Sequence, residues 1–319
     1  MRGAQLILMQ PLEHEIAAPA SIGNVGPGFD ALSIAVQLYL RVRILDVDRS
    51  AADRLETEFA GLPPRGENRI ERAFTLARLR TGIPAPGLRV RASTEIPVCA
   101  GLGSSAAAAI AGLRLYNAVT SALSEADMLS LACEIEGHPD NAAACLLGGL
   151  TVSCCRDDGR VIARPSPWPA RLRFAIATPD VELATKDARA VLPGSVPLAD
   201  AVFNLQRALL LVRAVENERY EDLREAFRDR WHQPARASLV PGLREALAID
   251  HPAVAGVCLS GSGPSIVALP VPGREQEAAA VLQDVYRTIQ IPVTVRILSA
   301  HQPIGAGATS VAIERENTA

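Results

Sequence analysis

Apolar and polar residues alternate along several short segments of the chain, and this predicts β-strands. Residues 88–92 (Leu-Arg-Val-Arg-Ala) alternate cleanly, and residues 38–45 alternate in part and are rich in apolar and β-branched side chains. Successive side chains of a strand point to opposite faces, so this pattern fits a sheet with one face on a core. Apolar runs predict further strands over residues 151–155, 171–177, 254–259, 265–269 and 292–297.

Between these strands, apolar residues recur at near-helical spacing. In residues 68–81, for example, Ile70, Ala73, Phe74 and Ala77 would share one face of a helix. A helix over 124–136 is supported by Ser124 and Asp127, which resemble a capping box. The same spacing predicts helices over residues 104–117, 198–217, 220–230 and 273–289.

The order of these elements predicts an α+β fold with two domains. Strands and helices mix without strict β-α-β alternation, and 319 residues is long for a single hydrophobic core. The proline-rich stretch 164–169 interrupts both helix and sheet, which makes it the best linker candidate. We therefore expect an N-terminal domain over residues 1–165 and a C-terminal domain over residues 166–319.

Composition narrows the classes of partner. The net charge of −3 gives no overall attraction for nucleic acid or an anionic membrane, so an anionic ligand must be held by local groups. The longest apolar run, residues 106–113, is too short to span a bilayer. The six cysteines form no CxxC pair and the five histidines show no HxxxH spacing. We expect reduced thiols in a cytoplasmic protein and no zinc site.

The most informative segment runs from Ile96 to Ala107 and reads as a strand, a Gly/Ser turn and a helix start. Gly101 and Gly103 allow positive φ angles and a close approach of the backbone to a ligand. Ser104 and Ser105 stand where an N-cap hydroxyl belongs. The free amides and the dipole of the helix start suit a polyphosphate. On the residues alone, a capped helix that binds nothing fits this pattern equally well. The segment is neither a Walker A loop nor GxGxxG, and no GxSxG elbow occurs in the chain.

Three segments in order resemble the three motifs of the GHMP kinases. Residues 18–30 resemble the first motif, residues 97–106 (Pro-x-x-x-Gly-Leu-Gly-Ser-Ser-Ala) the second, and residues 259–265 the third. The resemblance implies an N-terminal domain like ribosomal protein S5 domain 2 and a ferredoxin-like C-terminal domain. It also implies that ATP is bound by the second motif, through Pro97, Gly101, Leu102, Gly103, Ser104, Ser105 and Ala106.

Within this superfamily, other segments are similar to the homoserine kinases. They are residues 136–141 with 148–150, residues 185–193, and residues 233–236 with 239–242. The resemblance implies ATP-dependent phosphorylation of the side-chain hydroxyl of L-homoserine to O-phospho-L-homoserine, a step of threonine biosynthesis, by a homodimer. A mevalonate kinase would carry a lysine where Ser21 stands.

Homoserine is a zwitterion, so its site needs a cation for the carboxylate and an acceptor for the ammonium group. Arginine suits the carboxylate because its planar fork donates two parallel hydrogen bonds. By resemblance, Arg189 and Arg236 hold the carboxylate, and Asn24 and Asp30 hold the ammonium group.

The resemblance also gives roles around the reacting hydroxyl. His138 and Thr185 would line the substrate site, and Asp140 and Asn141 would orient the hydroxyl. In phosphoryl transfer the protein mostly positions groups and stabilises charge, so a base is optional. Asp140 as a general base stays an open alternative.

Mg²⁺ prefers hard oxygen ligands such as a carboxylate and a hydroxyl. Glu134 and Glu136 both lie in the last turn of the predicted helix 124–136, where the dipole disfavours negative charge and a cation would relieve it. By resemblance, Glu134 and Ser105 hold the metal, with Glu136 as the alternative to Glu134.

Two departures from the family pattern concern the nucleotide site: the first motif reads Ser-Ile-Gly-Asn at residues 21–24, and Cys99 replaces a common glycine. Two other functions therefore stay open. One is a GHMP kinase acting on an isoprenoid or a sugar alcohol, which a panel of substrates would identify. The other is a catalytically dead GHMP-fold binding protein, which would release no ADP.

Overall fold

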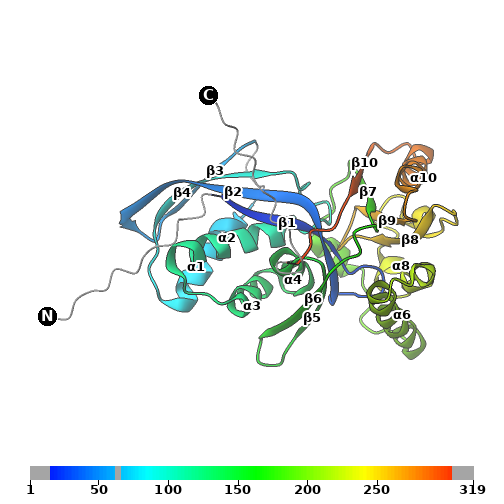
Figure 1. The fold of residues 1–319 in the computed structure, drawn as a ribbon, viewed down its shortest axis with the longest axis horizontal. Helices are drawn as coiled ribbons and strands as arrows, with labels where there is room; N and C mark the ends of the chain where they lie inside the picture. The colour runs from blue at the N-terminus through cyan, green and yellow to red at the C-terminus, as the bar shows by residue number, and fades with distance from the viewer. Residues whose placement is uncertain (1–14, 62–65, 304–319) are drawn as a thin grey trace.

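The structure is a computed structural model that describes residues 15–61 and 66–303. Its first sheet has the strand order β3-β4-β2-β5-β6, with β1 also pairing with β2. The long strand β2 is the common partner of β1, β4 and β5 (Figure 1). The strands are β1 (Glu15–Gly23), β2 (Leu32–Ala52), β3 (Leu55–Phe59), β4 (Pro86–Thr94), β5 (Leu150–Cys155) and β6 (Val161–Ser166).

Helices α1 (Arg69–Thr81), α2 (Ser104–Thr120), α3 (Glu125–Glu136) and α4 (Asp140–Leu147) lie together on one side of this sheet (Figure 1). The predicted capping box is confirmed, because the Ser124 side chain accepts from the Asp127 amide while Asp127 accepts from the Ser124 amide. Helices α1 and α2 pack closely at Gly112, where a Cβ atom would lie 2.2 Å from the Ile70 carbonyl oxygen. In the described part of the chain, no helix combines the length and apolar character needed to cross a membrane.

The second sheet is antiparallel, with the order β10-β7-β9-β8 that a ferredoxin-like domain requires. Helix α10 (Glu275–Thr288) packs against β7, β9 and β10. The α+β prediction and the predicted domain types are thus confirmed. The strands are β7 (Phe174–Pro179), β8 (Val254–Leu259), β9 (Ile266–Pro270) and β10 (Val293–Leu298). The other helices are α5 (Thr185–Ala190), α6 (Leu198–Glu216), α7 (Leu223–Ala226), α8 (His232–Arg236) and α9 (Leu243–Leu247), with a 3-10 turn at Tyr220–Asp222.

Two predictions about elements were right only in part, since residues 167–169 of the predicted linker form no helix or strand and Leu223–Ala226 of the predicted helix 220–230 is helical. The predicted linker 164–169 begins inside β6, where Pro165 pairs with Thr151; β6 is the edge strand of its sheet, and an edge tolerates a residue without an N–H group. The predicted helix 220–230 ends at Ala226. There the Asp229 carboxylate accepts from the amides of Trp231 and Gln233, which turns the chain. The domain boundary at residues 165/166 stays a prediction.

The last described residues return to the first sheet. The Gln37 amide donates to the Ser299 carbonyl at 3.0 Å, and the His301 amide donates to Ala35 at 2.8 Å. On the other side, the Gly149 amide donates to the His301 carbonyl at 2.7 Å. Residues 299–301 therefore run between β2 and the start of β5.

Candidate active site

A cavity of about 200 Å³ is lined by residues from both halves of the chain. It brings together all the residues predicted to bind the substrate or to orient its hydroxyl, namely Asn24, Asp30, His138, Asp140, Asn141, Thr185, Arg189 and Arg236. Of the predicted phosphate loop, Gly101, Gly103, Ser104 and Ser105 line it. Pro97, Leu102 and Ala106 do not, and the Leu102 and Ala106 side chains are buried in the core. The roles of these residues remain predictions.

The phosphate loop ends at Gly103, which is the N-cap of α2, with φ 69° and no side-chain cap. The expectation that Ser104 and Ser105 stand at the cap position was wrong, because they are the first two residues of the helix. The first amides of α2 are therefore left uncapped at the cavity, an arrangement that favours an anion. The loop is fixed from the third motif, since the Ser260 hydroxyl donates to the Gly101 carbonyl at 2.7 Å.

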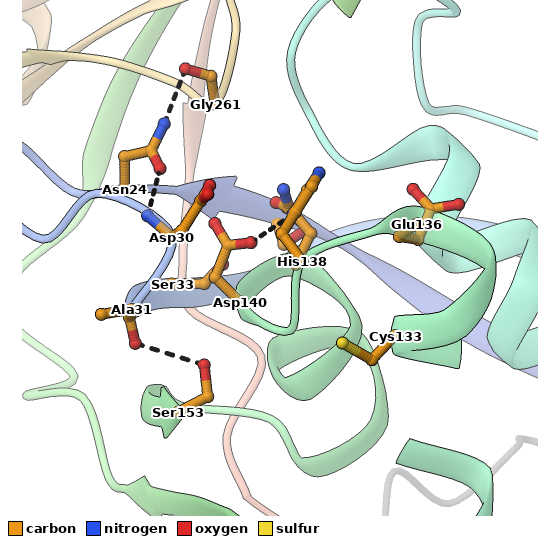
Figure 2. A network of polar contacts seen from close by, with 12 residues as sticks. Asn24, Asp30, Ala31, Ser33, Cys133, Glu136, His138, Asp140, Ser153 and Gly261 are labelled. Atoms are coloured by element: carbon orange, nitrogen blue, oxygen red, sulfur yellow. Dashed lines mark hydrogen bonds and ion pairs between the residues drawn. The ribbon is translucent and has the colours of Figure 1, made fainter. Parts of the chain in front are cut away.

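The first motif meets both of the others at this cavity. Ser21 donates through its hydroxyl to the Asn141 side-chain oxygen at 2.8 Å and through its amide to the Leu102 carbonyl at 3.1 Å. The Asn24 side-chain amide donates to the Gly261 carbonyl at 2.8 Å, and its oxygen accepts from the Asp30 amide at 3.0 Å (Figure 2). These bonds place the turn that carries Asp30 directly beside the phosphate loop and the third motif.

Asp30 and the two predicted arginines form one charged cluster. The Arg189 guanidinium donates to both Asp30 oxygens, at 2.8 and 3.0 Å. Arg236 is only 2% exposed, and burial, followed by the charge of Arg189, lowers its pKa to about 10. The Phe29 ring lies 5.6 Å from the Arg189 guanidinium and 5.4 Å from that of Arg236. Groups predicted to hold opposite ends of one zwitterion thus lie next to each other.

Asp140 is the first residue of α4 and is 1% exposed. Its Oδ1 lies 2.6 Å from Nδ1 of His138, which is a hydrogen-bonding distance (Figure 2). Burial alone would lower the pKa of His138, but the hydrogen bond and charge of Asp140, helped by the charge of Asp30, raise it. Ligand atoms of Asp30, His138 and Asp140 all lie within 4.8 Å of one another. No spacing in the sequence marks these three residues as a cation-binding group.

The metal assignment needs a correction at Glu134. Its carboxylate pairs with Arg80 at 2.5 Å and does not line the cavity. Glu136 does line it, and accepts from the Ser105 hydroxyl at 2.7 Å. Residues two apart on a helix point about 200° apart, so only one of these carboxylates can face the cavity. The carboxylate of Glu136 and the hydroxyl of Ser105 are the hard oxygen donors that suit Mg²⁺.

Several lining residues were not among the predicted site residues: Arg69, Cys99, Ile135, Leu183, Gly261 and Ser262. Gly261 and Ser262 belong to the third motif, which was a sufficient signal to include them. Arg69 and Leu183 come from segments outside the three motifs and reach the cavity only through the tertiary fold.

Comparisons with known proteins agree with this geometry. The GHMP kinases N terminal domain family matches residues 68–149, and the GHMP kinases C terminal family matches residues 211–288. The homoserine kinase of Deinococcus radiodurans is 42% identical over 254 residues, which cover 79% of this chain and 82% of that protein. The homoserine kinase of Desulfitobacterium hafniense is 39% identical over 272 residues, covering 84% and 91%.

A solved homoserine kinase from Cytophaga hutchinsonii superposes with a TM-score of 0.79 at 28% identity, covering 93% of this chain and 98% of that one. Sequence similarity at this level over most of the chain, together with both GHMP domains and one cavity shared by the three motifs, makes this chain a member of the homoserine kinase family of GHMP kinases.

Proposed function

We propose that this enzyme transfers the γ-phosphoryl group of ATP to the side-chain hydroxyl of L-homoserine, forming O-phospho-L-homoserine for threonine biosynthesis. The observation that carries the proposal is the charged cluster of Asp30, Arg189 and Arg236 in the same cavity as the uncapped start of α2. One end of the cavity is thus suited to a zwitterion and the other to a polyphosphate.

The charged cluster would bind the amino acid by exchanging partners. In the protein, Arg189 and Asp30 neutralise each other through two hydrogen bonds. A bound amino acid supplies both charges itself, with its carboxylate to Arg236 and Arg189 and its ammonium group to Asp30 and Asn24. An uncharged alcohol could not replace both halves of the pair, which favours an amino-acid substrate over an isoprenoid or sugar alcohol.

The phosphate end would hold ATP through the first amides of α2 and the backbone of Gly101 and Gly103. Mg²⁺ would be held by Glu136 and Ser105, and when bound it neutralises charge on the phosphates. Asn141 is fixed by the Ser21 hydroxyl, and Asp140 by His138, so both are held in place to orient the acceptor hydroxyl. Positioning of this kind supplies most of the catalysis in phosphoryl transfer.

The test is ADP release with L-homoserine, L-serine, L-threonine and mevalonate, with the product identified by ³¹P NMR. We expect turnover with L-homoserine to exceed that with the other acceptors. Faster turnover with mevalonate would reject the amino-acid assignment, and no ADP release with any acceptor would favour a catalytically dead binding protein.

The proposal includes a homodimer in the cytoplasm. On α6, Leu198, Val202, Leu205 and Leu209 form an apolar stripe, and they are 80%, 43%, 61% and 60% exposed. Their 4-3-4 spacing reads the same in both directions, so a second copy of α6 could pack antiparallel across a two-fold axis, with Leu198 against Leu209.

The cysteines are free thiols, which suits a reducing compartment.

A further inference from the structure

His232 lies one helical turn before Arg236, at the start of α8, and has no exposed surface. It lies behind the cavity wall and does not line the cavity itself. Its Nδ1 is 3.2 Å from Nη1 of Arg236, and its Nε2 is 2.7 Å from the Gly26 carbonyl oxygen. The imidazole therefore links the first motif to the buried arginine of the substrate site.

Both neighbours fix the same tautomer of this histidine. Arginine can only donate hydrogen bonds, so Nδ1 must be the acceptor and carry no proton. The Gly26 carbonyl can only accept, so Nε2 must carry the proton. We therefore assign the neutral Nε2–H form of His232. A protonated ring would lose the acceptor that faces Arg236 and place a second positive charge beside it.

Other charged groups around His232 act in both directions. The Asp229 carboxylate lies 3.6 Å from Nε2 and favours the protonated ring, as does Asp30 from farther away. Burial is the largest influence and lowers the pKa of His232, and the charge of Arg236 lowers it further. Asp229 already accepts from two backbone amides and from the Asn204 side chain, so it does not depend on His232 for a partner.

The donors of Arg236 show what this contact does. A guanidinium has five N–H groups in a fixed plane. Nε donates to the Ala188 carbonyl at 3.0 Å, and Nη1 donates to the Gly261 carbonyl at 3.0 Å and to His232. Within residues 15–61 and 66–303, these three bonds leave the two N–H groups of Nη2 without a protein acceptor. They are available to a ligand in the cavity that Arg236 lines.

We propose that His232 is a positioning residue of the substrate site, and that its Nδ1 acceptor holds the Arg236 guanidinium in the orientation that presents Nη2 to the substrate carboxylate. The inference rests on the proposed function. The Phe29 ring lies 5.3 Å from the His232 ring and 5.4 Å from the Arg236 guanidinium, so it supports both from one side.

Two substitutions test the acceptor Nδ1 and the donor Nε2 of the imidazole separately. In His232→Asn the amide oxygen occupies roughly the place of Nδ1 and keeps an acceptor for Arg236. In His232→Gln the amide nitrogen occupies roughly the place of Nε2 and keeps the donor to Gly26. We expect His232→Gln to lower kcat/KM for L-homoserine on the order of 10- to 100-fold, as for a lost hydrogen bond to a charged group, with the KM for ATP nearly unchanged. We expect His232→Asn to keep most of the wild-type value.

A merely structural role would give a different result. Equal losses in the two variants, or KM values for ATP and homoserine that rise together, would overturn the proposal. The pH profile gives a second readout. The wild-type KM for homoserine should rise at acid pH as His232 is protonated, whereas His232→Asn should lack that component. An identical acid limb in both proteins would contradict the proposal, and this comparison needs only the Asn variant to fold.

One measurement is independent of the substrate. In a long-range ¹H–¹⁵N correlation spectrum of the wild-type protein at neutral pH, His232 should show a protonated Nε2 and an unprotonated Nδ1. The opposite tautomer would exclude an acceptor at Nδ1 whatever the enzyme phosphorylates. A wild-type enzyme that does not phosphorylate homoserine, but has the expected tautomer, would reject the proposed substrate instead.

Discussion

The carboxylate of Asp30 and the guanidinium of Arg189 join the first motif to α5 through two hydrogen bonds of 2.8 and 3.0 Å. The two side chains are 31% and 37% exposed, so water and salt reach the pair from the cavity. A ligand with both charges can therefore replace this pairing without leaving either group unpaired in a dry interior.

Replacing Arg189 with Gln should weaken homoserine binding through the carboxylate. We expect kcat/KM for L-homoserine to fall roughly 10- to 100-fold, less than for a fully desolvated pair because the side chain is partly exposed. The KM for ATP should change little. The methyl ester of homoserine, which lacks the carboxylate charge, should be a poor substrate of the wild type and lose little more in the variant. Equal loss with both substrates would assign Arg189 to the fold or to the phosphates.

The two glutamates of α3 offer a matched pair for the metal site. Glu136→Gln keeps the shape but removes the negative charge beside Ser105, and we expect kcat to fall about 10²-fold or more. Extra Mg²⁺ should restore part of the loss. Glu134→Gln, which breaks only the pair with Arg80 on the surface, should stay near wild-type activity. The reverse result would show that the cavity-facing carboxylate is not the metal ligand.

Gly103 can be compared with Gly82, because both adopt positive φ, 69° and 68°. An alanine at either position bears about 1 kcal/mol of backbone strain. At Gly82 the new Cβ meets nothing within 4 Å, whereas at Gly103 it lies 2.1 Å from the Ser21 hydroxyl oxygen. Gly103→Ala should therefore also disturb the Ser21–Asn141 bond and weaken ATP binding, measured by calorimetry. ATP affinity unchanged from that of Gly82→Ala would argue against a phosphate loop here.

The pKa values of His138 and His232 should be shifted in opposite directions from the ordinary histidine value of about 6.5. The pKa of His138 is raised, because the hydrogen bond and charge of Asp140 outweigh the lowering by burial. The contribution of His138 to the free energy of unfolding is therefore full below about pH 6.5 and is lost as the pH rises through the pKa in the folded state. Burial lowers the pKa of His232, so stability falls as the pH drops below about 6.5, where the unfolded chain takes up a proton.

Side-chain NMR titration of the folded protein measures both histidines, with His138→Gln and His232→Asn used for assignment. The difference in unfolding free energy between wild type and His138→Gln should shrink as the pH rises above about 6.5. A His138 signal that titrates below the ordinary value would contradict the contact with Asp140.

The apolar stripe on α6 predicts the oligomeric state. Leu205→Glu places a charge at the centre of the stripe, where the antiparallel copy would bring Val202 against it, and should convert a dimer to a monomer in light scattering. Gln283→Glu adds the same charge to an exposed position on another helix, α10, and should leave the mass unchanged. A wild type that is monomeric at high concentration would reject the dimer.

The Gly/Ser turn at the start of α2 could be predicted from its own residues, whereas its ligand and the roles of the other site residues were expected only from the resemblance to the GHMP motifs. A glycine with positive φ, or a polar residue in a tight turn, can be recognised from the few residues around it. The strand β1, which carries the first motif, was not predicted because it is buried on both faces over residues 18–23 and lacks polar alternation. Helix α4 was missed because it is short and buried on all sides.

The orientation of side chains toward the cavity depended on the tertiary fold. The spacing of Glu134 and Glu136 places them on opposite sides of α3, but only the packing of that helix decides which one meets Ser105. In the same way, no local pattern shows that Asp30 and Arg189, separated by 159 positions, pair with each other, or that His232 reaches Gly26.

The return of residues 299–301 to the first sheet bears on the order in which a ribosome-bound chain can fold. Ala35, Gln37 and Gly149 stay without these partners until residues 299–301 have been synthesised. The Gln302 side chain then accepts from the Trp168 amide and donates to the Trp168 carbonyl, which holds the last described residues beside the start of the second domain. The first domain can begin to collapse during synthesis, but it is completed last, by residues that follow the entire second domain.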